Sequence, residues 1–201
     1  MHRIVSNRAE KTDQVLLLPS SLEDSTKSPP GTYTVLLLAL CGSIFAFFGA
    51  LVVAFLWRSQ ARPYWSAIEV PKILWLTTIL IVISSGTYEA ARRVYARGEW
   101  RLASRLLLIT AVIAAAFIAG QFTAWRQLME QGAYMMQNPH GSFFYLFTGL
   151  HAAHLIGGMV ALAYVLLGSN RRRELVNVVG YYWHFLTVLW LVLFILLLTV
   201  S

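Results

Sequence analysis

The amino-acid sequence predicts an all-α, polytopic membrane protein with five transmembrane helices, and two observations support this fold class. Of its 201 residues, 58% are hydrophobic and 12% are charged, and the mean hydropathy is +0.62, which is too apolar for an ordinary soluble domain. Apolar stretches recur at about 33–57, 71–91, 104–125, 143–168 and 179–200. Each is long enough for a helix rising about 1.5 Å per residue to cross a hydrocarbon core of roughly 30 Å. The sequence has no alternating strands of the kind a transmembrane barrel requires, so we expect a helical bundle.

The first 32 residues are predicted to form a largely irregular tail ahead of a transmembrane domain that spans residues 33–201. The tail mixes acidic and basic residues with Ser and Pro, and the segment KSPPG at residues 27–31 stops any helix before the first span. The apolar run VLLL at residues 15–18 is too short for the core of a signal peptide. We therefore expect the tail to be retained.

Basic residues are unevenly divided between the two ends of the spans. The formal net charge is +7, but Lys and Arg collect beside the apolar stretches, which argues against a nucleic-acid-binding protein. Five spans place the tail and the loops after the second and fourth spans on one side, with twelve Lys and Arg residues against four on the other. The positive-inside rule then predicts a cytoplasmic N-terminus and a C-terminus on the outer side.

Polar side chains inside the spans are the main candidates for function, because such groups are costly in hydrocarbon. Glu89 lies near the inner end of the second span, and Arg93 follows at the four-residue spacing that brings side chains together on one helix face. One interpretation is an interfacial ion pair; the other is a buried carboxylate that serves proton uptake or a neighbouring subunit. Gln121 in the third span is expected to hydrogen-bond to a neighbouring helix, and the small and hydroxyl residues of ISSGTYE at 83–89 allow close helix contact. Cys41 is the one cysteine, so no disulfide forms within the chain.

Three histidines enter the spans and are the first candidates for a metal or haem site. His151 and His154 are three residues apart on one side of the fourth span, and His184 enters the fifth span from the cytoplasmic side. Imidazoles bind zinc, copper and haem iron. However, a haem held by two histidines needs ligands at matched depth on facing helices, whereas His154 lies deeper than His184 and no carboxylate or cysteine joins the set. We therefore expect hydrogen-bonded packing between helices, helped by the small residues Gly149 and Gly157, rather than metal or haem ligation.

Two motifs in the last two spans are specific enough to suggest a family. They are FFYLFTGLHAAHLIGG at residues 143–158 and YYWHFLTVLWLVLF at residues 181–194. Both resemble subunit III of the haem-copper respiratory oxidases, whose helices carry a Thr-Gly-aromatic-His-Gly-x-His pattern and a Tyr-Trp-His-Phe-Val-Asp-x-x-Trp pattern. The matching residues are Thr148, Gly149, His151, His154, Tyr182, Trp183, His184, Phe185 and Trp190. The segments FAFFGALVVAFLWRS at 45–59 and GQFTAW at 120–125 are also similar, and five spans match the short bacterial form of this subunit.

The resemblance implies an accessory role. Subunit III carries no haem or copper; it packs against catalytic subunit I of an oxidase that also has a copper-bearing subunit II, binds phospholipid between its helices, and supports proton uptake and oxygen access. By this resemblance we expect a cofactor-free accessory subunit of a proton-translocating cytochrome c or quinol oxidase in the bacterial inner membrane, with the C-terminus in the periplasm. The candidates for interhelical or lipid contacts are then His151, His154, His184, Glu89, Gln121, Trp183 and Thr148.

The sequence departs from the family pattern at four acidic positions. Where the family usually carries three Glu and one Asp, this chain has Ile44, Ala124, Asn177 and Thr187. Glu89 is the only clear acidic residue left within the spans. This chain therefore lacks the carboxylates that the resemblance would assign to proton supply or to the binding of lipid headgroups.

Two other functions stay open. A subunit III-like protein of a nitric oxide reductase or another respiratory complex fits the missing acids, because nitric oxide reduction need not pump protons. A free-standing haem-b carrier or a small transporter is the second alternative. A transporter is disfavoured because the sequence shows no inverted repeat and no broken membrane helix, apart from Pro71 at the start of a span.

Overall fold

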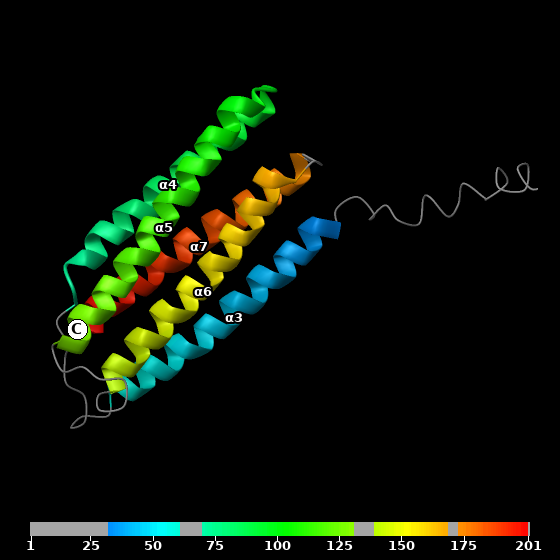
Figure 1. The fold of residues 1–201 in the computed structure, drawn as a ribbon. Coiled ribbons are helices and arrows are strands. Elements are labelled where there is room, and N and C mark those ends of the chain that lie inside the picture. Colours follow the sequence, from blue (N-terminus) through cyan, green and yellow to red (C-terminus); the bar gives the residue numbers. More distant parts are fainter. Residues whose placement is uncertain (1–31, 61–69, 131–138, 169–172, 201) are drawn as a thin grey trace, which may run out of the picture.

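The structure is a computed structural model that describes residues 32–60, 70–130, 139–168 and 173–200. In these residues the chain forms five α-helices and no strand: α3 (Thr32–Ser59), α4 (Ile73–Ala96), α5 (Trp100–Glu130), α6 (Pro139–Leu167) and α7 (Arg173–Val200) (Figure 1). All five are long and apolar enough to cross a membrane. The predicted fold class is confirmed. The N-terminal tail predicted over residues 1–32 lies, up to residue 31, outside the described residues.

The turn between α4 and α5 shows how the chain reverses at one end of the bundle. The amide of Arg97 donates to the carbonyl of Val94, and the amide of Gly98 donates to that of Tyr95, which closes the last turn of α4. Gly98 then adopts a φ of 86°, a left-handed conformation that residues with a Cβ rarely adopt. Helix α5 begins two residues later at Trp100. We call this end of the bundle the basic end, because Arg92, Arg93, Arg97, Arg101 and Arg105 lie on or beside this turn.

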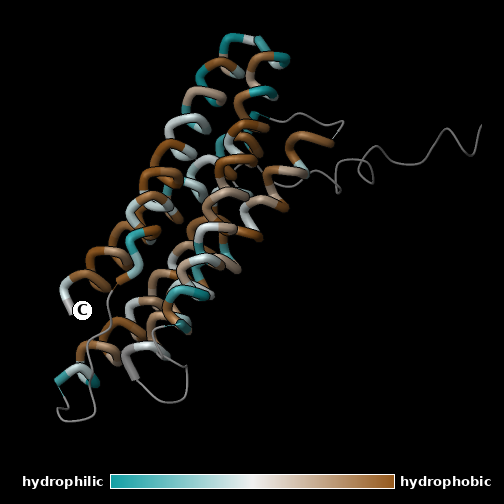
Figure 2. Tube along the Cα trace, turned by 60° about the vertical axis from the view of Figure 1, so that its left-hand side comes forward, coloured by the Kyte–Doolittle hydropathy of each residue, from teal (hydrophilic) through white to brown (hydrophobic). Residues whose placement is uncertain are grey.

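The five helices pack as a long antiparallel pair set against a group of three. Helices α4 and α5 form the pair, and they lie beside α7, α6 and α3 (Figure 1). Helices α6 and α7 each pack against three others, α7 against α3, α4 and α6, and α6 against α3, α5 and α7, whereas α3 contacts only α6 and α7. The hydropathy colouring shows mostly apolar residues along the helices and hydrophilic residues at the tip of the α4–α5 turn (Figure 2).

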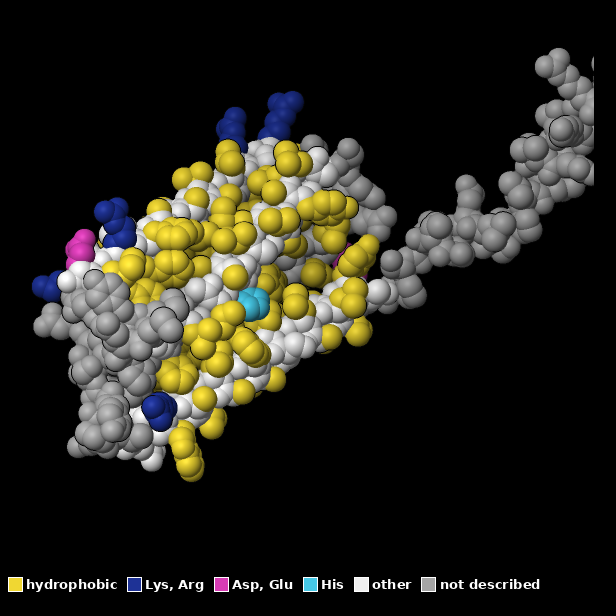
Figure 3. Space-filling model, turned by 60° about the horizontal axis from the view of Figure 1, so that its bottom comes forward, with side chains coloured by type: hydrophobic (Ala, Val, Ile, Leu, Met, Phe, Trp, Pro, Cys, Tyr) yellow, Lys and Arg dark blue, Asp and Glu magenta, His cyan; other side chains and the backbone are white. Residues whose placement is uncertain are grey.

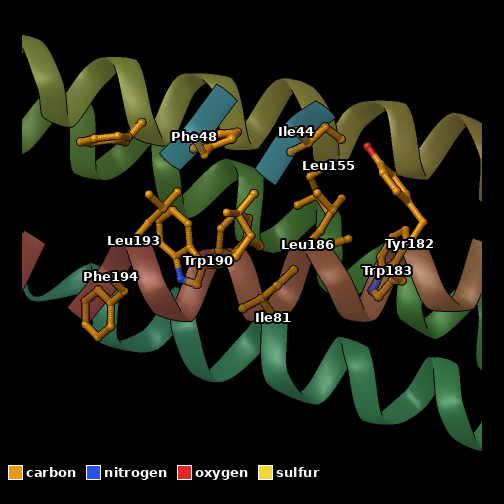
Figure 4. Packing of buried hydrophobic residues seen from close by; sticks show 14 of the residues in the cluster. Ile44, Phe48, Ile81, Leu155, Tyr182, Trp183, Leu186, Trp190, Leu193 and Phe194 are labelled. Carbon is orange, nitrogen blue, oxygen red and sulfur yellow. The ribbon is translucent and has the colours of Figure 1, made fainter. Parts of the chain in front are cut away.

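The core is built from large side chains of α7 and the helices around it. The two tryptophans Trp183 and Trp190 are fully buried, as are Tyr88, Phe48 and Phe117. Figure 4 shows the two tryptophans on α7 together with Ile44 and Phe48 of α3 and Leu155 of α6. Burying aromatic side chains of this size contributes strongly to packing.

The outer surface is apolar along the length of the bundle. Large exposed hydrophobic side chains occur on every described helix, for example Leu38, Ile79, Val112, Val160 and Val188. Figure 3 shows hydrophobic side chains over most of one face, with Lys and Arg side chains mainly toward its edges. Exposed apolar surface this extensive requires lipid or partner proteins around it, which agrees with a multi-pass membrane protein.

Candidate functional site

The polar residues predicted from the sequence fall into two clusters and one isolated position. Glu89, Trp183 and His184 lie together near the basic end, where α4 meets α7. Gln121, Thr148 and His151 lie further along the bundle, on the faces of α5 and α6 that are buried. His154 sits apart from both clusters, at mid-length of α6.

Glu89 is held by three basic side chains. Nε of Arg93 donates a hydrogen bond to Oε1 at 2.9 Å, and Nη2 of Arg92 lies 2.9 Å from Oε2. Nε2 of His184, on α7, lies 3.5 Å from the same Oε2. The Glu89 side chain is 24% exposed, so this group of charges sits at the edge of the bundle, although Oε2 itself is buried and has no hydrogen-bond partner among the described residues. Arg92 also lies over the ring of Tyr181, 5.1 Å from its centre, which adds a contact between α4 and α7.

His184 joins α7 to α4 through both of its ring nitrogens. Nδ1 lies 2.6 Å from the hydroxyl oxygen of Ser85, and Nε2 faces Glu89 one helical turn away on α4. Because the ring engages two groups on one neighbouring helix, it fixes both the spacing and the rotation of α7 against α4. Ser85 belongs to the segment that the sequence marks as suited to close helix contact.

Trp183 extends this contact to a third helix. Its Nε1 donates to the hydroxyl of Ser84 at 3.1 Å, and its ring stacks on Tyr88 with 5.8 Å between centres. The Ser84 hydroxyl donates in turn to the carbonyl of Thr110 on α5 at 3.4 Å. The Tyr88 hydroxyl donates to the carbonyl of Val176 on α7 at 3.1 Å. Helices α4, α5 and α7 are therefore linked by a continuous set of buried polar contacts near the basic end.

Gln121 links α5 to α4 through its amide nitrogen. Nε2 donates to the hydroxyl of Thr77 at 3.1 Å, and both side chains are buried. The adjacent Thr78 accepts a hydrogen bond from Nε1 of Trp190, on α7, at 3.0 Å. Through Thr77 and Thr78, α4 therefore makes one of these hydrogen bonds with α5 and one with α7. Oε1 of Gln121 is buried and has no hydrogen-bond partner among the described residues.

Thr148 receives a hydrogen bond from α5. Nε1 of Trp125 donates to its hydroxyl oxygen at 2.9 Å, while the hydroxyl itself donates to the carbonyl of Phe144 at 2.7 Å. Close by, the hydroxyl of Tyr145 donates to the carbonyl of Trp125 at 3.3 Å. These bonds set the antiparallel register of α5 against α6, with residues 145–148 of α6 level with Trp125.

His151 is fully buried between aromatic rings. Its centre lies 5.0 Å from the ring of Trp190 and 5.7 Å from that of Phe117. Neither ring nitrogen has a hydrogen-bond partner in the described part of the chain. The register of α5 and α6 places this ring about level with Gln121, whose Oε1 is the other unpartnered polar atom in this part of the core.

His154 lies three residues further along the same helix but has different surroundings. Its Nδ1 lies 2.7 Å from the carbonyl oxygen of Leu150, within α6, and its ring packs edge-on against Phe48 of α3 at 5.7 Å. Its own carbonyl accepts a hydrogen bond from the Tyr182 hydroxyl at 3.2 Å. Among the described contacts, a hydrogen bond from an imidazole to another helix is therefore seen for His184 and not for His151 or His154.

The three imidazoles do not converge. His151 faces the core, His154 faces α3, and His184 faces α4. Over residues 32–60, 70–130, 139–168 and 173–200, no group of three or more His, Cys, Asp or Glu side chains is arranged to hold a metal ion. What this arrangement achieves chemically is the fixing of helices by polar contacts inside an apolar bundle.

The four positions that depart from the acidic family pattern lie at or near the core. Ile44, Ala124 and Thr187 are buried, and Asn177 is half-buried. The Thr187 hydroxyl donates to the carbonyl of Trp183, within α7, at 3.1 Å. Uncharged residues at these positions avoid the cost of burying a carboxylate, so the interior needs no hydrogen-bonding or charged partner for one there.

Comparison with known proteins identifies the family. The model of the family "Cytochrome c oxidase subunit III" matches residues 35–201, which include all five membrane-spanning helices except the first three residues of α3. The chain belongs to this family. Among curated members of the subunit III family, a probable cytochrome c oxidase subunit 3 of Nocardia farcinica is 30% identical over 164 residues, covering 77% of this chain and 81% of its relative. The cytochrome c oxidase subunit 3 of Corynebacterium diphtheriae is 34% identical over 134 residues, or 64% and 65% of the two chains, and that of Synechocystis sp. is 28% identical over 162 residues, or 75% and 68%.

Several residues that complete these contacts were not singled out from the sequence. They are Thr77, Thr78 and Thr110 as acceptors; Trp125 and Trp190 belong to the motifs noted in the sequence, but their role as donors was not predicted. A signal for them exists, because a hydroxyl or indole N–H inside an apolar span needs a partner on a neighbouring helix or its own backbone. The sequence does not say which partner that is.

Proposed function

We propose that this chain is an accessory, cofactor-free subunit of a proton-translocating terminal oxidase in a bacterial cytoplasmic membrane. Membership of the subunit III family is the observation that carries the proposal, since the match covers all five membrane-spanning helices. The subunit III family forms a non-catalytic part of a larger complex, so association with other oxidase subunits follows from the family. Packing against a haem- and copper-containing subunit I and a copper-bearing subunit II is the specific form that we propose.

The interior supports a scaffold role. Most of the buried polar groups described above pair with one another, from Glu89 and His184 at the basic end to Trp125 and Thr148 further along. The outer surface, in contrast, leaves wide apolar faces on all helices. A bundle that pairs most of its polar groups internally and exposes apolar ones outward is suited to contact both lipid and partner helices. We infer that bound phospholipid and the catalytic subunit share this surface.

Glu89 is the group through which the chain would support proton uptake. It lies on α4, seven residues before the helix ends at the basic end, and its side chain is 24% exposed. Its contacts with Arg92, Arg93 and His184 hold the carboxylate in one place. A carboxylate fixed in this way can place a negative charge beside the site where protons enter the partner subunit. The chain would thereby steady the partner rather than conduct protons itself.

The orientation that we propose places the basic end in the cytoplasm. Arg92, Arg93, Arg97, Arg101, Arg105 and Arg173 lie toward that end, whereas Arg58, Lys72 and Arg126 lie toward the other. The excess of arginine supports a cytoplasmic N-terminus and a periplasmic C-terminus.

The proposal is tested by isolating the chain from its own membranes. An affinity tag on the chain, mild solubilisation and mass spectrometry should identify a haem-copper catalytic subunit and a copper-bearing subunit in stoichiometric amounts. The isolated complex should consume oxygen with a quinol or a reduced cytochrome c as donor. Recovery of a nitric oxide reductase, or of the chain alone with its own haem absorption, would contradict the proposal.

A further inference from the structure

His154 presents an unpaired ring nitrogen halfway along a membrane helix. Its Nδ1 lies 2.7 Å from the carbonyl oxygen of Leu150. A carbonyl oxygen can only accept a hydrogen bond, so Nδ1 must carry the hydrogen. In the neutral ring, the other nitrogen, Nε2, is then a hydrogen-bond acceptor.

Nothing in the described part of the chain donates to Nε2. The atom is not one of the fully buried polar atoms, and the side chain is half-buried, with one side against Phe48. At mid-length of α6 the surroundings are hydrocarbon tails, which have no donor to offer, and lipid headgroups are too far away. An acceptor left unpaired in such a place costs free energy, so a donor from another polypeptide is favoured there.

The surface of α6 next to His154 allows another helix to come close. Ala153 and Gly157 are exposed on either side of it, and a Cβ added at Gly157 would meet no atom within 4 Å. Val160, one turn further, is 66% exposed. Beside Gly157 an apolar hollow of about 350 Å³ opens between α3, α6 and α7, with Ala161 in its wall. Small side chains permit close helix contact, and the hollow can take a side chain of an approaching helix.

We propose that this surface, the α6 docking face made of Ala153, His154, Gly157 and Val160, binds a transmembrane helix of a partner subunit. That helix carries a hydrogen-bond donor at mid-membrane depth, such as a Ser, Thr, Asn, Gln or Trp side chain, which bonds to Nε2 of His154. The inference rests on the proposed accessory function and adds to it the surface that meets the partner and the chemistry that the partner must present.

Two substitutions on the α6 docking face test the proposal in the intact complex. His154→Phe keeps a ring against Phe48 and removes the acceptor, so we expect the partner subunits to be retained about 3- to 20-fold less well, the range for a membrane hydrogen bond. His154→Gln keeps an acceptor and should restore much of the retention. Gly157→Leu blocks close approach and should release the partner.

Gly86→Leu is the matched control. Gly86 lies on α4, is exposed, and also has no atom within 4 Å of an added Cβ, so leucine fits there as it does at Gly157. It should leave partner retention unchanged. The amount of folded chain in the membrane is measured for every variant, so that loss of folding is separated from loss of docking.

The outcomes separate this inference from the proposed function. If the unaltered chain isolates with oxidase subunits but His154→Phe and Gly157→Leu are retained equally well, the docking face is refuted and the accessory function stands. If the unaltered chain brings no oxidase subunit with it, the proposed function itself fails. A photoreactive residue at Val160 should form an adduct with a partner subunit; an adduct with a second copy of this chain, or with lipid alone, would also overturn the inference.

Discussion

Nδ1 of His184 on α7 lies 2.6 Å from the hydroxyl of Ser85 on α4, and Nε2 of the same ring lies 3.5 Å from the Glu89 carboxylate one turn along. The ring therefore contacts α4 at two positions that are one helical turn apart. It lies where α7 packs against α4 near the basic end.

This contact should have a measurable coupling energy. In a double-mutant cycle of Ser85→Ala and His184→Phe, we expect the free energies of unfolding in detergent to show a coupling of about 0.6–1.7 kcal/mol, as for other hydrogen bonds between membrane helices. Ser43→Ala is the control, because the Ser43 hydroxyl bonds only to the Ala39 carbonyl on its own helix. Additive effects for Ser85 and His184 would show that the bond contributes nothing.

The buried ring of His151 should be replaceable. Its two nitrogens lack partners among the described residues, so a leucine of similar size removes an unfavourable burial and keeps contact with Trp190 and Phe117. We expect His151→Leu to unfold with a free energy equal to or above that of the unaltered chain. Trp183→Ala is the contrasting variant and should lose about 3–5 kcal/mol, since it empties a large core site. A loss for His151→Leu of the same size as that of Trp183→Ala would mean that the ring has a partner.

Two glycines should respond in opposite directions to alanine. A Cβ at Gly180 would lie 2.8 Å from Cε1 of Tyr88. The Tyr88 ring stacks on Trp183, and its hydroxyl donates a hydrogen bond to a backbone carbonyl of α7, so the ring has little freedom to move away. Gly180→Ala should therefore push α4 from α7 and lower the free energy of unfolding by about 1–3 kcal/mol. Gly86→Ala, with open space around its Cβ, should be neutral or stabilising by up to about 1 kcal/mol. Equal responses at the two positions would contradict the packing of α4 on α7.

The orientation is testable with reporters. A fluorescent protein that folds only in the cytoplasm should fluoresce when fused before Met1 and stay dark when fused after Ser201, because the excess of arginine favours the cytoplasmic side for the basic end. A periplasmically active enzyme at the same two positions should give the reverse result. Activity of that enzyme at Met1 would show the opposite orientation.

The number and type of helices could be predicted because they depend on the length and apolarity of each stretch alone. Each apolar stretch is long and uninterrupted, so it can be recognised as a helix without knowing which other helix it packs against. Five stretches therefore predicted five helices. The spacing of Glu89 and Arg93 likewise predicted their contact, because both residues lie on one helix.

Contacts between helices could not be predicted in the same way. Helix α6 is apolar on all sides, so its sequence does not show which face is buried, and His151 and His154 look equivalent although one lies in the core and the other at the surface. The pairing of His184 with Ser85 depends on the rotation of α7 against α4, which is set by the stacking of Tyr88 on Trp183. The same is true of the donors Trp125 and Trp190, whose partners lie on other helices.

The most direct test of the account is the reduced-minus-oxidised absorption spectrum of the purified complex, measured with His151, His154 or His184 replaced singly by glutamine. Because the imidazoles are assigned to packing and docking and the cofactors to partner subunits, all three variants should show the haem bands of the unaltered complex, normalised to the catalytic subunit. This should hold even where less of this chain is retained. Loss or shift of a haem band on replacement of any of the three rings would show that it is a ligand, and would contradict the account.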